Sequence, residues 1–226
     1  MKLKHLFIIL LSVLVVSCKK DEGTKLDPNT ITINDGGMIT GTYTNGQKVV
    51  VKKGTVILRG YTYFESGSQL TIEPGTIIKS DIASKGALVI ERGAKIFAEG
   101  TATEPIVFTS GKAVGERMPG DWGGIIVLGN APTNRLTEPT IEGGVGRKYG
   151  GTDPNDNSGV IKYVRIEFAG IAEAQGSEIN GLTLGGVGAG TTIDYVQVTY
   201  GNDDAYEFFG GTVNAKHLIA YATADD

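Results

Sequence analysis

Two pairs of adjacent aspartates could do chemistry in this chain. Asp203 and Asp204 precede Asp225 and Asp226 by 22 residues. If that distance is one coil of a parallel β-structure, the pairs stack on neighbouring rungs about 4.8 Å apart. Two carboxylates at that distance repel by about 3 kcal/mol at an effective dielectric of 20. Such a stack can bind calcium, can share a proton as an acid and a base, or can lie in solvated turns.

Each alternative makes its own prediction. Asp204 and Asp226 are the candidate catalytic pair, because the arrangement resembles the paired aspartates of β-helical pectin-cleaving glycosidases; the basic and histidine motifs that accompany those aspartates are not visible here. Asp203 and Asp204 are candidate calcium ligands. A solvated turn on each rung requires no ligand at all.

A second oxygen-rich segment runs from Asp153 to Gly159. Asp153, Asn155 and Asn157 alternate as calcium ligands do in a binding loop. The glycine comes one position late, and Val164 stands where a bidentate glutamate would close such a loop. We therefore weigh a calcium site at these three residues against an Asx-rich turn.

Aromatic residues form a third set of candidates, for contact with sugar rings. Trp122 stands just before a long Gly- and Pro-containing segment, 129–159, and Tyr149 stands within it. Tyr61 and Tyr63 form a second aromatic group. These four side chains could stack on the apolar faces of glycans, with the long segment as one wall of a groove, or could pack on their neighbours.

Histidine and cysteine are too scarce for several other chemistries. The chain has two histidines and one cysteine. A zinc site built from these residues and a cysteine nucleophile are therefore excluded. A Ser-His-Asp triad would have to use His217, which we expect to be a packed or surface residue of an apolar strand because no G-x-S-x-G elbow accompanies it.

The elements that position these residues repeat along the chain. Short apolar strands followed by a polar pair and a glycine occur at Val49–Ile57, Leu70–Ile78 and Leu88–Ile96, with glycines at 54, 75 and 93. Ile106 and Ile125 begin further strands 18 and 19 residues on. A period near 20 built of short strands and glycine turns predicts an all-β chain that forms a β-solenoid.

The later half repeats on a longer spacing. The segment Ile161–Phe168 matches Ile193–Tyr200, and Leu182–Gly186 supplies a strand between them. Alternation places Val164, Ile166 and Phe168 on the inner face. We predict a right-handed parallel β-helix with coils of about 18–22 residues, and a β-sandwich is the alternative.

The N-terminus predicts an export signal and a lipid anchor. Lys2 and Lys4 precede an apolar stretch from Leu6 to Val16, which is too short to span a bilayer. Ser17-Cys18 resembles the bacterial lipobox, so residues 1–17 are the expected signal and Cys18 the lipidated first residue of the mature chain. Lys19-Lys20-Asp21-Glu22 resembles the signal that exports lipoproteins to the outer face of the outer membrane, or is a solvated linker.

Three longer segments carry a family resemblance. Asp121–Pro132, Tyr149–Gly159 and Asn202–Gly211 resemble a family of Bacteroidota surface lipoproteins, and the similarity extends over roughly residues 50–226. The resemblance implies a right-handed parallel β-helix, mostly without assigned activity. Relatives continue past the position of Asp226, and no polar cap is visible there, so we expect a longer protein.

Composition sets the remaining limits. The net charge of −4 argues against nucleic acid as a partner. We expect a lipidated polar linker at 18–29 and a β-helix domain at 30–226. The leading hypothesis is a lipid-anchored surface protein that binds glycans or another surface protein without catalysis. A polysaccharide lyase or glycoside hydrolase and a structural envelope protein are the alternatives.

Overall fold

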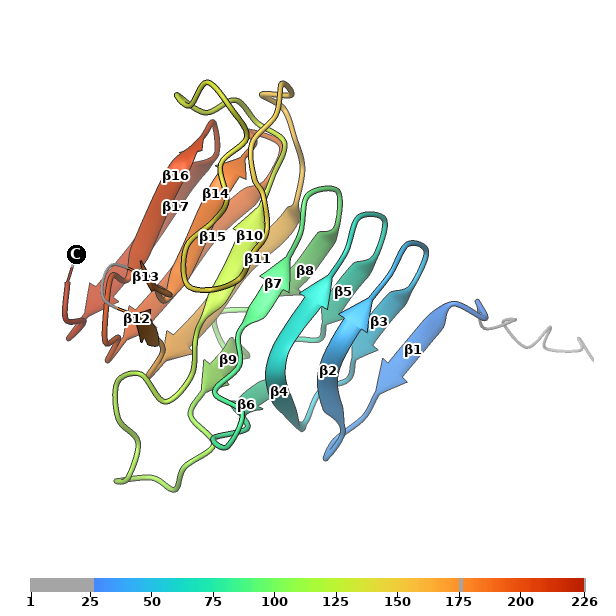
Figure 1. Ribbon diagram of the computed structural model, residues 1–226. Helices are drawn as coiled ribbons and strands as arrows, with labels where there is room; N and C mark the ends of the chain where they lie inside the picture. The colour runs from blue at the N-terminus through green and yellow to red at the C-terminus, as the bar shows by residue number, and fades with distance from the viewer. Residues whose placement is uncertain (1–26, 175–176, 226) are drawn as a thin grey trace, which may run out of the picture.

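The computed structural model describes residues 27–174 and 177–225, and nearly all of its regular structure is parallel β. In these residues 15 strands form one continuous sheet that coils around a core, and a separate pair, β12 (Ala172–Ala174) and β13 (Ser177–Glu178), is antiparallel. Figure 1 shows the coils side by side, from β1 at the blue end to β16 and β17 at the red end. Within this part of the chain the structure contains no helix that could cross a membrane.

The sheet has three faces, because several strands bend and pair with different neighbours at their two ends. Face 1 consists of β1, β3, β5, β8 and the first halves of β11, β15 and β17. The strands confined to it are β1 (Thr30–Ile33), β3 (Lys48–Val51), β5 (Gln69–Ile72) and β8 (Lys95–Glu99). The bent strands that leave it are β11 (Gly159–Glu167), β15 (Thr192–Thr199) and β17 (Asn214–Tyr221).

Face 2 and face 3 complete each coil. Face 2 contains the first halves of β2 (Met38–Tyr43) and β4 (Thr55–Phe64), then β6 (Ile77–Ser80), β9 (Ile106–Thr109) and the second halves of β11, β15 and β17. Face 3 contains the second halves of β2 and β4, then β7 (Leu88–Ile90), β10 (Ile125–Leu128), β14 (Leu182–Val187) and β16 (Tyr206–Gly211).

Apolar side chains from the three faces meet inside the coil. On face 1, Val51, Ile72, Ala98, Ile161 and Ile193 are in register and buried. No single coil can bury these residues, so each coil is stabilised by its neighbours. The predicted right-handed parallel β-helix is confirmed. The β-sandwich alternative is wrong, because sandwich strands pair antiparallel whereas these are parallel.

The predicted coil length holds only near the two ends. In-register pairs put Thr30 and Lys48 18 residues apart, Lys48 and Gln69 21 apart, and Thr192 and Asn214 22 apart. The middle coils are longer: Gln69 pairs with Lys95, and Ile96 with Gly159, because segments 110–124 and 129–158 are inserted between strands. The long loop predicted at 129–159 is present, and the insertion at 110–124 was not predicted.

The predicted repeat also needs a correction. Leu88–Ile90 is not the next rung above Leu70–Ile72: it pairs with Thr62–Phe64 on face 3, whereas Gln69–Ile72 pairs with Lys95–Ala98. All three faces use the same pattern of two apolar residues, a polar pair and a glycine. The spacing near 18 therefore reports a strand and its turn, not a whole coil.

Candidate functional site

Three bent strands turn from face 1 to face 2 at an aromatic residue. Tyr163, Tyr195 and His217 have φ values of 49°, 52° and 50°. They lie at corresponding positions, because the residues on either side are in register across β11, β15 and β17. Left-handed backbone is unfavourable for residues other than glycine, and glycine does occur in the turn between β5 and β6, at Gly75. Large aromatic residues at this turn therefore invite a functional explanation.

The three rings stack into a ladder, which we call the corner ladder. The centroids of Tyr163 and Tyr195 are 4.6 Å apart with planes at 9°, and those of Tyr195 and His217 are 4.2 Å apart with planes at 7°. Each such pair contributes about 0.5–1.5 kcal/mol beyond area burial. Because the rings face one another along the axis of the β-helix, they present their edges to the outside.

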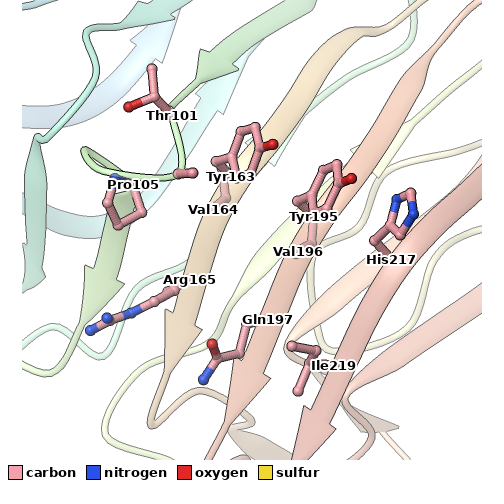
Figure 2. A pocket seen from close by; sticks show the side chains of 11 residues that line it. Thr101, Pro105, Tyr163, Val164, Arg165, Tyr195, Val196, Gln197, His217 and Ile219 are labelled. Atoms are coloured by element: carbon pink, nitrogen blue, oxygen red, sulfur yellow. The ribbon is translucent and has the colours of Figure 1, made fainter.

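A groove of about 280 Å³ lies beside the corner ladder. Figure 2 shows the ladder in one row and a second row, Arg165, Gln197 and Ile219, two residues further along the same strands. The turn that contains Thr101 and Pro105 closes one end. The groove therefore crosses β11, β15 and β17 at a right angle to the strands.

Two contacts hold the polar groups of the groove. Nη2 of Arg165 donates to the Glu167 carboxylate at 2.7 Å. Nδ1 of His217 lies 2.7 Å from Oδ1 of Asp194 on the preceding coil. This second contact fixes the imidazole ring through Nδ1, so Nε2 is the nitrogen that a ligand can reach. The groove thus offers phenol hydroxyls, an imidazole, a guanidinium and an amide, a set suited to binding hydroxyl groups.

A separate group of carboxylates surrounds β16. Burial, followed by the charge of Glu142 and a hydrogen bond with it, raises the pKa of Glu207 to about 8, although Asn180 donates to the same carboxylate and opposes the shift. Burial and then the charge of Asp204 raise the pKa of Asp203 to about 6. Glu142 comes from the 129–158 loop, so this loop brings its carboxyl group against β16. Raised carboxyl pKa values are typical of acids that act near neutral pH.

The structure places Trp122 in the core rather than in a binding groove. Its side chain is 1% exposed, its Nε1 donates to the carbonyl of Glu167 at 2.8 Å, and its ring lies 6.1 Å from that of Phe108. Its burial argues against the glycan contact predicted for it.

The other predicted aromatic contacts are mostly covered by the long loop. Tyr149 is 5% exposed and packs against Phe209 at 5.8 Å. Arg147 lies 4.5 Å above the ring of Tyr63 and pairs with Glu91 at 2.7 Å. Tyr61 stacks beside Tyr63 at 6.5 Å. Ile141 and Val145 of the loop join the same outer apolar cluster, which is therefore a docking site for the loop itself.

The predicted calcium ligands of the Asp153 segment make local turns. Oδ1 of Asp153 accepts from the Asn155 backbone N–H at 2.9 Å, and Oδ1 of Asn157 accepts from the Gly159 N–H at 2.8 Å. This geometry fits the Asx-turn alternative. Among the described residues no three His, Cys, Asp or Glu side chains are grouped so that they could hold a metal ion.

The aspartate stack can be followed in part. The charges of Asp204 and Asp225 both raise the pKa of Asp203, so the two predicted pairs do face each other across one coil. Asp226 lies outside the described residues, as do Cys18 and the rest of residues 1–26. The proposed catalytic pair of Asp204 and Asp226 therefore stays a prediction.

Sequence reasoning missed the corner ladder and Glu207. The signal for the ladder was present, because Tyr163 and Tyr195 occupy the same position in the matched segments Ile161–Phe168 and Ile193–Tyr200. His217 was expected to be packed or on the surface, and it is exposed. No sequence signal connects Glu142 with Glu207, which are 65 residues apart and meet only through the loop.

A comparison with protein families agrees with this architecture. Residues 41–226 match the family of pectate-lyase-like β-helix domains. The chain belongs to this family. Neither the curated proteins nor the solved structures provide a significant match to the chain.

Proposed function

We propose that this protein is a lipid-anchored cell-surface protein that binds glycans in the groove beside the corner ladder, without catalysis. The observation that carries the proposal is the groove of about 280 Å³, lined by stacked Tyr163, Tyr195 and His217 and by Arg165 and Gln197. Hydroxyl-rich ligands suit such a wall, because each side chain offers a hydrogen-bond donor or acceptor beside an apolar edge.

The anchor belongs to the same proposal. Lipidation of Cys18 would attach the mature chain to the outer membrane, and the Lys19-Lys20-Asp21-Glu22 run would direct it to the exterior. Its resemblance to Bacteroidota surface lipoproteins supports this location. A glycan-binding face on the outside of the cell would be in contact with extracellular polysaccharide, or with the glycans of another surface protein.

The composition of the groove favours binding over catalysis. Among the groove-lining residues of the described chain, none is an aspartate, a glutamate or a cysteine. Cleavage of a glycosidic bond ordinarily requires two carboxyl groups beside the bond. The groove lacks that pair, although it has the groups that bind a sugar.

A polysaccharide hydrolase is the second candidate, and one observation favours it. Glu207 has a pKa of about 8 beside Glu142 and Asp203, so it would hold a proton at neutral pH as a general acid must. This carboxyl group lies on β16 of face 3, whereas the groove crosses faces 1 and 2.

The test is a retention and cleavage assay with the full-length chain in detergent. The protein would be passed over immobilised neutral and acidic polysaccharides, with calcium and with a chelator, while the eluate is assayed for new chain ends. Retention without new ends supports the proposal. New ends that disappear in Glu207→Gln favour the hydrolase. A chain that neither binds nor cleaves leaves the structural envelope protein as the better account, and a chelator effect would identify a calcium requirement.

A further inference from the structure

The groove beside the corner ladder presents similar groups on successive coils. Tyr163 and Tyr195 each place a phenol hydroxyl at the same corner of neighbouring coils, and Arg165 and Gln197 each place an N–H donor in the second row. Neighbouring strands are about 4.8 Å apart. A ligand that satisfies both rows must therefore be extended, must run along the axis of the β-helix, and must offer polar groups at about that interval. A linear polysaccharide chain has this form, with one monosaccharide per coil.

The stacking within the ladder decides how a sugar can touch it. Tyr195 has a ring on each side, Tyr163 at 4.6 Å and His217 at 4.2 Å, so neither of its faces can receive a sugar ring. Its side chain is nevertheless exposed, at 41% for the residue, because the ring edge and hydroxyl point outward. Contact at this position therefore depends on hydrogen bonds to the ligand rather than on face-to-face stacking.

Charge in the groove is compensated from within the protein. Arg165 is the lining residue with a permanent charge in the described chain, and Glu167 pairs with it at 2.7 Å. His217 is paired with Asp194. Lys162 lies outside the lining, over the ring of Tyr163 and in register with Glu99 and Asp194. A polymer with a carboxylate on every sugar would meet no cation without a carboxylate near it, and would approach Glu167 and Asp194.

We propose that the groove takes a neutral, extended polysaccharide that lies parallel to the β-helix axis and occupies about one sugar per coil across β11, β15 and β17. This inference rests on the proposed function, since it specifies the glycan for the same groove. It also assigns the hydroxyl of Tyr195 as a direct ligand contact.

The test compares a neutral glucan with its carboxymethylated derivative, which has the same backbone and added carboxylates. Retention of the full-length protein would be measured for the unmodified chain, for Tyr195→Phe and for Tyr200→Phe. Tyr200 is a matched control: it is 43% exposed, has a φ of 57°, and stacks on Phe168 at 5.2 Å in a second ladder outside the groove. Circular dichroism would establish that both variants are folded.

We expect the neutral glucan to bind better than its carboxymethylated form, with little dependence on salt. Tyr195→Phe should weaken binding about five- to tenfold, as expected for one lost hydrogen bond, and Tyr200→Phe should leave it unchanged. With soluble oligosaccharides, affinity should rise up to about three sugars and then level off, since three coils line the groove.

Three results would overturn the inference, and they differ in what they leave standing. Stronger, salt-sensitive binding of the carboxymethylated polymer, lost in Arg165→Gln, would show that the ligand is acidic while glycan binding stands. Unchanged binding in Tyr195→Phe would move the glycan site elsewhere. Retention of no glycan at all, in the wider panel as well, would remove the proposed function together with this inference.

Discussion

A β-carbon on Gly86 would lie 1.8 Å from the carbonyl oxygen of Gly60. The two residues belong to neighbouring coils, and Gly60 has a φ of 63° at the bend of β4. Backbone hydrogen bonds fix the approach on both sides: the Gly60 N–H donates to Oγ of Ser84, and the Thr62 N–H donates to the carbonyl of Ala87. Two backbones therefore touch here, and no flexible side chain separates them.

We expect Gly86→Ala to lower the free energy of unfolding by about 2 kcal/mol or more, because relief of the clash must separate hydrogen-bonded coils. Gly201→Ala is the matched control, since its nearest atom is a side-chain methyl, Cγ2 of Thr223, at 3.0 Å. This control should cost less than about 1 kcal/mol. Denaturant unfolding measures both, and equal losses would contradict the backbone contact between Gly60 and Gly86.

Burial of Trp122 predicts an effect on stability and none on the ligand site. Trp122→Ala should lower the free energy of unfolding by about 3–5 kcal/mol, because it leaves a cavity beside Phe108. Trp122→Phe should cost less, since it keeps most of the volume and loses the hydrogen bond to the Glu167 carbonyl. In a folded Trp122→Phe variant, glycan retention should match that of the unmodified chain. Selective loss of retention would return Trp122 to the binding site.

Glu207 predicts a stability that falls as pH rises. Its pKa is about 8 in the folded chain against a usual value of 4.5. Between about pH 4.5 and 8 the folded state holds a proton that the unfolded state has released, so each increase in pH favours unfolding. The stabilisation is complete below pH 4.5 and lost above pH 8. Asp203, with its pKa of about 6 against 3.8, adds to the trend between about pH 4 and 6.

The measurement is the unfolding midpoint from pH 4 to 9. Glu207→Gln should flatten the upper part of this profile, because the amide cannot ionise. The effect should be modest, since solvent reaches part of the carboxyl group. Glu104→Gln, on an exposed residue that pairs with Lys53 in the turn between β8 and β9, is the control and should retain the slope. An unchanged profile in Glu207→Gln would show that this carboxyl does not titrate as described.

The lipid anchor predicts two separable defects. Cys18→Ala should release the protein from the membrane fraction, because stable attachment needs acyl chains on that residue. Alanine at positions 19–22 should leave the protein in the membrane fraction but protect it from protease added to intact cells. Fractionation and protease accessibility measure the two effects. A Cys18→Ala protein that remains in the membrane would exclude anchoring through this cysteine.

The sequence was sufficient to predict the type of fold, because apolar side chains must alternate along each strand and recur in each coil. Ile161 and Ile193 were matched correctly, and they are in register in the structure. The same pattern could not distinguish the three faces, since Leu88 and Leu70 are surrounded by the same residue types. Only the hydrogen-bonded partners show that they lie on different faces.

Alternation also failed at the corners, where a single left-handed residue changes which side the next residue faces. Phe168 was expected inside with Val164 and Ile166, but its φ of 62° turns it outward to stack on Tyr200. The corner ladder was missed for the same reason. Tyr163 and Tyr195 were visible as a repeat, but their use as turn residues cannot be inferred from types that normally occupy strands.

The contacts made by the loop were the least predictable part of the site. Trp122 and Tyr149 were sensible aromatic candidates by type. Whether they are exposed depends on where segments 110–124 and 129–158 fold back, and the residues that fix those segments, such as Arg147 on Glu91, are far apart in sequence.

The coil that begins at Thr192 is paired in register on both sides, with Val160 before it and Asn214 after it. Its 22 residues carry one rung of the ladder, Tyr195, and one of the second row, Gln197. A tandem copy of residues 192–213 would accordingly insert one more rung without altering any existing contact partner in kind. The length of the binding track is thus set by gene duplication, in steps of one coil. Natural selection or a protein engineer could lengthen it without redesigning a single side chain.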